Sequence, residues 1–255
     1  MAMPNASSAS KAAPARRLSA VSGAALVPGG TSFRTGGAGL VATMNDMPES
    51  GLGQRERNKL EKRNRIKAAV RALIETKGFD EMTTREIARA AEVGLGTLFS
   101  YATNKRDLLF LVFNDEQDKL LDATYREIDA GLLFVEQLVA AFRPFYEFFA
   151  GEPTFARYLL RELIFYESGA QAQRFQQGRR RIVSRIEQLV AAAQKQGQIG
   201  SPEDARTIAR LVFAVYQAEI RRWLLEPNPR PKQGLEALRR VLKLVVRGLE
   251  PTATA

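Results

Sequence analysis

Residues 83–105 read TTREIARAAEVGLGTLFSYATNK, and this stretch decides the fold that we predict. Ile87, Ala88, Val93 and Leu98 have the spacing at which two short helices cross at roughly 90 to 120° and pack together. The outward positions of the second helix, which would face a DNA groove, are Gly94, Leu95, Thr97, Ser100 and Tyr101. A plain helical hairpin has the same apolar spacing, so the flanking residues must decide between the two.

Both flanks carry helix-start signals. Thr83 and Thr84 are good N-cap residues, and Glu86 is placed to complete a capping box, so we expect a helix to begin here. The free backbone N–H groups at its start can donate hydrogen bonds to a phosphate oxygen. After the second helix, Asn104 can cap a third helix that opens with Lys105 and Arg106. Cations at a helix start oppose its dipole, which favours an external anion such as a DNA phosphate. The alternative is a solvated cationic face.

The stretch resembles the TetR family of transcriptional regulators, and the resemblance runs from Arg57 to Leu121. The family pattern is a threonine-capped helix, I-A-x-x-A, then V-x-x-G-T-(L/I)-(aromatic)-x-(Tyr/His) and a nearby lysine. Its positions are matched by Thr84, Ile87, Ala88, Ala91, Val93, Gly96, Thr97, Leu98, Phe99, Tyr101 and Lys105. Glu92 replaces the family's turn glycine, which costs on the order of 1 kcal/mol if its φ is positive. Ala102 replaces a usual phenylalanine.

The resemblance implies an all-α protein with an N-terminal three-helix helix-turn-helix DNA-binding domain, followed by a helical ligand-binding and dimerisation domain. We place the DNA-binding domain at 55–104, the second domain at 105–250 and a tail at 251–255. The implied function is a ligand-responsive transcriptional regulator, a repressor, which binds a near-palindromic operator as a dimer. A small apolar or aromatic ligand then releases it from the operator.

The expected partner of the first domain is double-stranded DNA. Phosphate contacts fix a protein on the duplex, whereas contacts with base edges read its sequence. We expect phosphate contacts from Thr84, Thr97, Tyr101 and Lys105. We expect base contacts from Gly94, Leu95 and Ser100, with Arg85 reaching in.

Basic residues are dense just upstream, and they lead into a helix of about twenty residues that ends near Lys77. The basic positions are Arg55, Arg57, Lys59, Lys62, Arg63, Arg65 and Lys67. Between Arg55 and Phe110 there are thirteen Lys and Arg against eight Asp and Glu. This surplus suits a module that faces phosphate.

Composition excludes several classes of site. The chain has 38 basic and 28 acidic residues, a formal charge of +10, and neither histidine nor cysteine. A Ser-His-Asp triad, a cysteine nucleophile, zinc-finger ligation and disulfides are therefore impossible. The sequence shows no glycine-rich phosphate loop or acidic metal cluster, so we expect no enzyme, cofactor or metal site.

Residues 1–54 are rich in Ala, Ser and Gly and lack apolar periodicity, which predicts a disordered basic extension. A transit peptide or a twin-arginine signal is an alternative, as is translation that starts at Met44 or Met47. No stretch approaches 18 uninterrupted apolar residues, so we expect a soluble, cytoplasmic protein without a membrane partner.

Residues 105–250 read as helices throughout. The predicted segments are 105–129, 132–150, 153–168, 170–196, 203–226 and 234–249, and Pro144 is expected to kink the second. The last two are apolar beyond the needs of one contact stripe. Their stripes are Ile208, Leu211, Val212, Val215, Ile220, Trp223 and Leu224, then Leu235, Leu238, Val241, Leu242, Val245, Val246 and Leu249. The family pairs these helices in a homodimer; burial within one subunit is the alternative.

Aromatic residues gather between 134 and 216, where the resemblance implies a pocket for a small-molecule effector. Our candidate ligand contacts are Phe142, Tyr146, Tyr158, Arg161, Phe165 and Tyr216. Aromatic side chains at helical spacing are also typical of a plain core. Two other functional classes stay open: a non-specific architectural DNA-binding protein, and a helical module whose helix pair binds protein.

Overall fold

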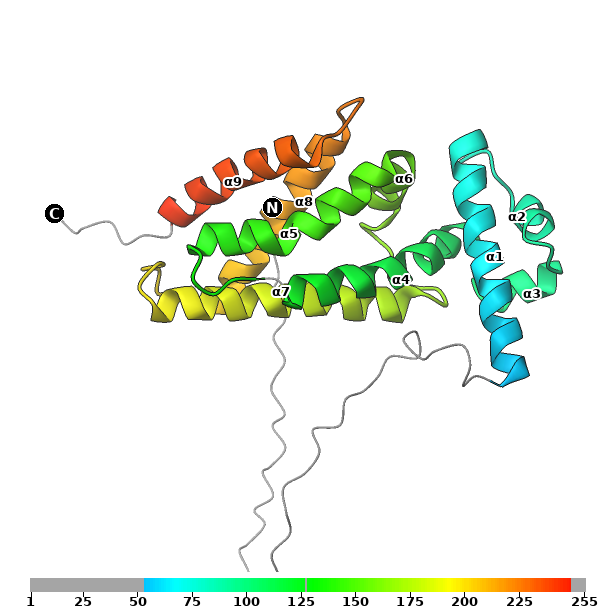
Figure 1. The fold of residues 1–255 in the computed structure, drawn as a ribbon, viewed down its shortest axis with the longest axis horizontal. Coiled ribbons are helices and arrows are strands. Elements are labelled where there is room, and N and C mark those ends of the chain that lie inside the picture. The colour runs from blue at the N-terminus through cyan, green and yellow to red at the C-terminus, as the bar shows by residue number, and fades with distance from the viewer. Residues whose placement is uncertain (1–52, 127, 249–255) are drawn as a thin grey trace, which may run out of the picture. The chain divides into compact units, whose positions relative to one another are not determined.

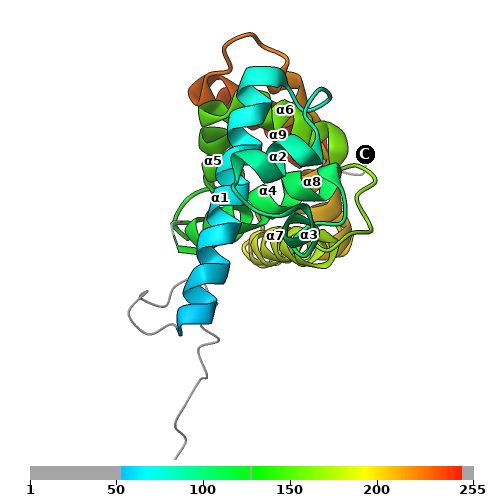
Figure 2. The same cartoon turned by 90° about the vertical axis from the view of Figure 1, so that its right-hand side faces the viewer.

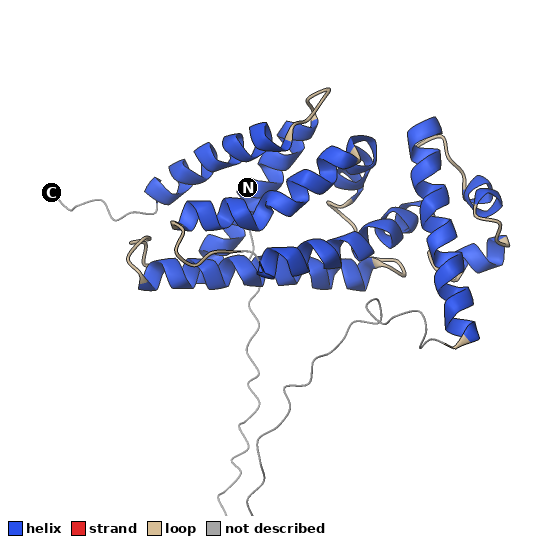
Figure 3. Cartoon of the chain, in the orientation of Figure 1, coloured by secondary structure: helices blue, strands red, loops and turns tan. Residues whose placement is uncertain are grey.

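The computed structural model describes residues 53–126 and 128–248, and in this part of the chain the secondary structure is helices joined by loops, with no strand (Figures 1 and 3). This confirms the predicted all-α class. The helices are α1 Gln54–Lys77, α2 Thr84–Ala90, α3 Leu95–Phe99, α4 Lys105–Arg126, α5 Phe134–Gly151, α6 Pro153–Glu162, α7 Ala172–Lys195, α8 Ala205–Leu224 and α9 Pro231–Gly248. Most of the predicted N-terminal extension and the predicted tail lie outside the described residues.

Helices α2 and α3 form the predicted helix-turn-helix, packed beside α1 (Figure 2). The predicted capping box starts α2: the Glu86 amide donates to Thr83 Oγ1 at 3.2 Å, and the Thr83 amide donates to the Glu86 carboxylate at 2.8 Å. Ile87 and Leu98 are fully buried between the helices. Glu92, in the turn, has a φ of 52°, which is the left-handed conformation that favours glycine.

The start of α4 is tied to the loop that precedes α7. Asn104 caps α4 as predicted, because its Oδ1 accepts from the Asp107 amide at 2.9 Å. The buried Asp107 carboxylate accepts from the amides of Ala170 and Gln171 at 2.8 and 3.0 Å, and from the hydroxyl of Tyr166. These bonds fasten the beginning of α4 to the α6–α7 loop.

The predicted helix bounds were wrong at α6 and α9. Helix α6 ends at Glu162 rather than 168, since the chain turns so that Tyr166 can stack on Phe110 with ring centroids 3.5 Å apart. Gly169, with a φ of 131°, then redirects the chain into α7. Helix α9 begins at Pro231 rather than 234, which agrees with the preference of proline for the first position of a helix.

Helices α4 to α9 bury the large aromatic side chains around one core. Phe142 stacks on Tyr216 at 4.0 Å between α5 and α8, and Tyr146 packs against Trp223 at 4.8 Å. Gly234 allows α9 to pack closely against the Tyr146 ring, because a Cβ at position 234 would lie 2.6 Å from that ring. Pro144 lies inside α5, which continues to Gly151. None of the described helices is long and apolar enough to cross a membrane.

Candidate functional site

The second helix of the helix-turn-helix, α3, presents one face to solvent. Gly94, Leu95 and Ser100 are exposed, and Thr97 and Tyr101 are half-exposed, so the five outward positions are accessible as predicted. Arg85 on α2 is also exposed, and Thr84 is half-exposed. Such a face can present small and polar side chains to a groove.

A hollow of about 500 Å³ opens between this face and α1. Arg55, Lys59 and Lys62 line it from α1, and none of the three has an acidic partner among the described residues. From the other side it is lined by Thr97, Ser100 and Tyr101, and Asn58 completes it. The Tyr101 hydroxyl donates to the Lys59 carbonyl at 3.0 Å, which fixes the two walls together. Sequence reasoning noted the basic density of α1 but did not assign these residues to the site.

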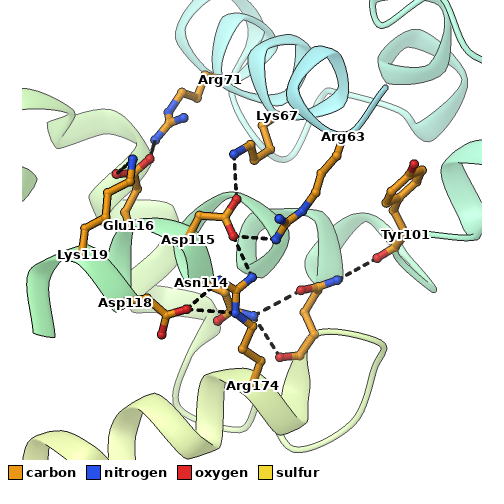
Figure 4. A network of polar contacts seen from close by, with 11 residues as sticks. Arg63, Lys67, Arg71, Tyr101, Asn114, Asp115, Glu116, Asp118, Lys119 and Arg174 are labelled. Atoms are coloured by element: carbon orange, nitrogen blue, oxygen red, sulfur yellow. Dashed lines mark hydrogen bonds and ion pairs between the residues drawn. The ribbon is translucent and has the colours of Figure 1, made fainter. Parts of the chain in front are cut away.

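Further along α1, the cations turn inward to acidic partners. Arg63 and Lys67 contact the two oxygens of Asp115 on α4 at 2.5 and 2.7 Å, and Arg174 of α7 contacts the same carboxylate at 2.7 Å (Figure 4). Asp115 is buried, with 1% of its side chain exposed. One carboxylate thus joins α1, α4 and α7.

The three cations determine the charge state of Asp115. Burial alone raises the pKa of a carboxyl group, but the hydrogen bond from Lys67 and the charge of Arg63 hold the pKa of Asp115 below its usual value. Arg71, one turn beyond Lys67, pairs with Glu152 at 2.8 Å. The inner half of α1 is therefore committed to contacts within the protein.

Lys105, predicted to hold a phosphate, lies against the loop that follows α1. Its Nζ donates to the Asp80 carbonyl at 2.9 Å and lies 4.8 Å from the centre of the Phe79 ring. Arg106 forms an ion pair with Glu162 at 3.3 Å and also donates to the Glu162 carbonyl. The two cations at the start of α4, which we expected to meet an external anion, with a solvated face as the alternative, are thus engaged with protein groups.

A partly open cavity of about 50 Å³ lies among α4, α5, α6, α7 and α8. Its polar lining comprises Gln117, Arg179, Gln217 and Arg221. The aromatic lining consists of Phe113, Phe145, Phe149, Phe175, Phe213 and Tyr216. An apolar chamber with a few polar groups is the usual form of a small-molecule site.

The structure brings one predicted ligand contact, Tyr216, to this cavity. Phe142 and Tyr146 do not line it; they pack against Tyr216 and Trp223 of α8. Two more face the loop after α1: Arg161 pairs with Asp80 at 2.7 Å, and its guanidinium lies 5.1 Å from the Tyr158 ring centre. Phe165 is 81% exposed.

The apolar stripes of α8 and α9 divide into buried and exposed parts. The buried part packs within the subunit, and it comprises Ile208, Val212, Ile220, Trp223, Leu224, Leu235, Leu238 and Leu242. The part facing outward is smaller: Leu211 is 44% exposed, and Val215, Val241, Val245 and Val246 are half-exposed. Leu244, which is not in the predicted stripe, is 65% exposed on α9. Leu249 lies outside the described residues.

Two family models match the chain. The one described as "Bacterial regulatory proteins, tetR family" matches residues 66–112, and the one described as "Tetracyclin repressor-like, C-terminal domain" matches residues 132–224. The first spans the second half of α1, the helix-turn-helix and the start of α4, and the second covers α5 to α8, which line the cavity together with α4. Together they cover more than half of the chain.

Known proteins are similar over most of this length. The fatty acid metabolism regulator protein of Bacillus subtilis (strain 168) is 23% identical over 186 residues, which make up 72% of this chain and 93% of its own. The HTH-type transcriptional repressor KstR of Mycobacterium tuberculosis is 25% identical over 178 residues, covering 70% and 77%. The crystal structure of the TetR family repressor FadR of Thermus thermophilus in complex with lauroyl-CoA superposes with a TM-score of 0.58 at 25% identity, covering 75% of this chain and 97% of FadR.

Proposed function

This chain is a ligand-responsive transcriptional regulator of the TetR family, and we propose that it represses transcription by binding a near-palindromic operator as a homodimer. An acyl thioester that enters the cavity between α4 and α8 then releases it. The observation that carries the DNA-binding part is the shared hollow. In it, α1 cations that pair with no acid in the described part of the chain face the hydroxyl groups of α3 and of the two residues that follow it. A repressor of this kind acts on chromosomal DNA in the cytoplasm.

The hollow assigns roles to its two walls. Arg55, Lys59 and Lys62 neutralise phosphates, and Thr97 donates a hydrogen bond to them, which positions the protein on the duplex. Tyr101 joins these phosphate contacts only when its hydroxyl leaves the Lys59 carbonyl. Gly94, Leu95, Ser100 and Arg85 then meet base edges in the major groove, where a leucine reads a thymine methyl group. Thr84 and Lys105 extend the phosphate contacts at the edges of this face.

Selection of operator DNA tests the specificity of this face. Random duplexes retained by the purified protein are sequenced, and the enriched duplex is compared with an unrelated one at physiological salt. We expect a preference of about a thousandfold or more, with the enriched sequence nearly palindromic. Equal affinity for both duplexes would favour the non-specific architectural function. The absence of salt-sensitive DNA binding would favour a protein-interaction module.

The homodimer uses the outward apolar side chains of α8 and α9. Leu211 and Leu244 are large, apolar and well exposed on adjacent helices, a combination typical of an association surface. We expect Leu211→Arg and Leu244→Arg to convert a dimer into monomers in sedimentation experiments. Leu225→Arg is the matched control, because Leu225 is 81% exposed but lies beyond the end of α8. A wild-type monomer at micromolar concentration contradicts the dimer.

The proposed effector class rests on the cavity and on the relatives. One relative is named for fatty acid metabolism, and another was crystallised with lauroyl-CoA. Six aromatic side chains line the cavity, and this apolar lining suits an alkyl chain. Its volume of about 50 Å³ holds only one or two water molecules at ~30 Å³ each, so an acyl chain must push the helices apart to enter.

Helix α4 transmits this displacement to the DNA-binding face. Its Phe113 and Gln117 line the cavity, while Asp115, between them in sequence, holds Arg63 and Lys67 of α1. Since packed cores shift between discrete arrangements rather than deform continuously, a moved α4 moves α1. The ligand thereby favours a state in which the two reading heads of a dimer no longer match the operator.

Release of the operator by lauroyl-CoA tests the effector. We expect saturating lauroyl-CoA to weaken operator binding by about 5- to 150-fold in a fluorescence anisotropy titration, the usual range of allosteric coupling. Coenzyme A alone is the control for its charge. If lauroyl-CoA binds the protein but leaves operator affinity unchanged, the proposed response is wrong.

A further inference from the structure

The charges around the cavity are unbalanced. Arg179 on α7 and Arg221 on α8 both line it, and no carboxylate does. Isolated guanidinium groups at an apolar cavity are costly, because burial removes water that stabilises the charge. Both side chains are half-exposed, so water stabilises their charge in the ligand-free protein, and an anion in the cavity can take the place of that water.

Neither arginine pairs with an acid among the described residues. Arg221 donates from Nη1 to the Gln217 carbonyl at 2.8 Å, but its Nε is buried and meets no acceptor among the described residues. Arg179 lies over the Phe213 ring, 5.7 Å from its centre, and forms no ion pair in the described part of the chain. Burial lowers the pKa of Arg221, and the nearby charge of Arg179 lowers it further.

A buried amide completes the polar side of the cavity. Gln117 is 3% exposed and makes no side-chain hydrogen bond within the described residues. Gly178 of α7 allows it to lie there, since a Cβ at that position would collide with the amide. An amide of this kind offers two N–H donors.

We propose that Arg179, Arg221 and Gln117 form an oxyanion-binding site that fixes the acidic end of an amphipathic acyl ligand. The inference rests on the proposed function, which supplies the acyl chain, and adds the requirement for a negative charge. Guanidinium groups bind carboxylate and phosphoryl oxygens in two-pronged, charge-assisted hydrogen bonds. The oxyanion is either the carboxylate of a free acid or a phosphoryl group of a thioester.

A ligand series of constant chain length separates these sources. Calorimetric titrations compare sodium dodecanoate, lauroyl-CoA and dodecanol, all below their aggregation limits. We expect dodecanol to bind at least about tenfold more weakly than the better of the two anions. Tighter binding of dodecanoate identifies a carboxylate site, and tighter binding of lauroyl-CoA a phosphoryl site. Equal binding of dodecanol and both anions overturns the proposal.

Variants locate the charge requirement. Arg179→Gln, Arg221→Gln and the double variant should each lose about 10- to 100-fold in affinity for the anion and little for dodecanol. Arg180→Gln is the matched control, because Arg180 is exposed on the same helix and does not line the cavity. If Arg180→Gln weakens anion binding as much as Arg179→Gln, general attraction explains the effect and the site is overturned.

Inorganic sulfate probes the site without any acyl chain. At constant ionic strength, sulfate should raise the Tm of the wild type by a few degrees more than that of the Arg179→Gln, Arg221→Gln double variant. If no acyl ligand binds but this difference appears, the oxyanion site stands and the proposed acyl effector fails. If acyl ligands bind both proteins equally and sulfate makes no difference, the effector stands and the oxyanion site fails.

Discussion

Helix α7 places arginines in two regions that differ in charge balance: carboxylates lie beside the arginine in one region, and no carboxylate lines the other. At the junction with α1, Arg174 joins Arg63 and Lys67 around the single buried carboxylate of Asp115 and also pairs with Asp118 at 2.6 Å. At the cavity, Arg179 of α7 lies beside the aromatic lining without a carboxylate. Arg174 therefore stabilises the fold through carboxylates, whereas Arg179 lies at the cavity with no acid to offset its charge there.

The largest expected effect breaks the junction. Asp115→Asn leaves Arg63, Lys67 and Arg174 facing one another around a neutral amide, so we expect urea unfolding to show a loss of about 3–5 kcal/mol. Asp122→Asn is the matched control, because Asp122 is 48% exposed and, among the described residues, pairs only with Arg181. That change should cost at most about 1 kcal/mol. Equal losses in both variants would remove the distinction between the two regions.

Replacing an arginine by methionine should change the free energy of unfolding in opposite directions in the two regions. Arg174→Met removes one partner of a buried carboxylate, and we expect the free energy of unfolding to fall by about 2 kcal/mol. Arg221→Met removes a half-buried guanidinium whose buried Nε has no acceptor among the described residues, and we expect a rise of about 1 kcal/mol in the ligand-free protein. Denaturant unfolding measures both. A fall in both variants would show that the cavity arginines are structural.

Acid titration sharpens the assignment of Asp115. Its pKa is lowered in the folded protein, so its contribution to stability is present above the unfolded value of 3.8 and is lost as the pH falls through the lowered pKa. The stability difference between wild type and Asp115→Asn should therefore be constant near neutrality and narrow below about pH 4. A difference that is unchanged down to pH 2 would assign the stabilisation to packing.

The exposed pair of Arg65 and Glu92 extends the comparison to the surface. The Glu92 side chain is 80% exposed, so Glu92→Gln should change stability by less than about 0.5 kcal/mol. Glu92→Gly also relieves the positive φ, and we expect thermal unfolding to show a gain of about 0.5–1 kcal/mol over Glu92→Gln. The absence of any gain would mean that this turn does not strain a non-glycine residue.

Local signals made much of the fold predictable. The capping box of Thr83 and Glu86 and the cap of Asn104 depend on residues three positions apart, which the sequence displays directly. The end of α6 was missed because apolar residues continue through Ile164 and Phe165. That helix ends at Glu162, and the chain then turns so that Tyr166 reaches Asp107 on α4, 59 residues away in the chain.

The sites were less predictable where they depend on long-range packing. The outward face of α3 follows from helical periodicity. By contrast, Phe142, Phe145, Tyr146 and Phe149 share one helix at similar spacing, and only the neighbouring helices determine which side chains face the cavity. Likewise, Arg161 has the chemistry of a ligand anchor, but the fold brings it to Asp80. The pairing of α1 cations with Asp115 spans about fifty residues and left no local signal.

The salt dependence of operator binding tests the central claim, that Arg55, Lys59 and Lys62 of α1 dock on DNA together with the outward face of α3. Lys59→Ala combined with Lys62→Ala is compared with wild type and with Lys195→Ala, an exposed lysine at the far end of α7. The account predicts that the slope of log affinity against log salt falls by about two contacts per head in the double variant and is unchanged in the control. A slope that equals that of wild type would contradict it.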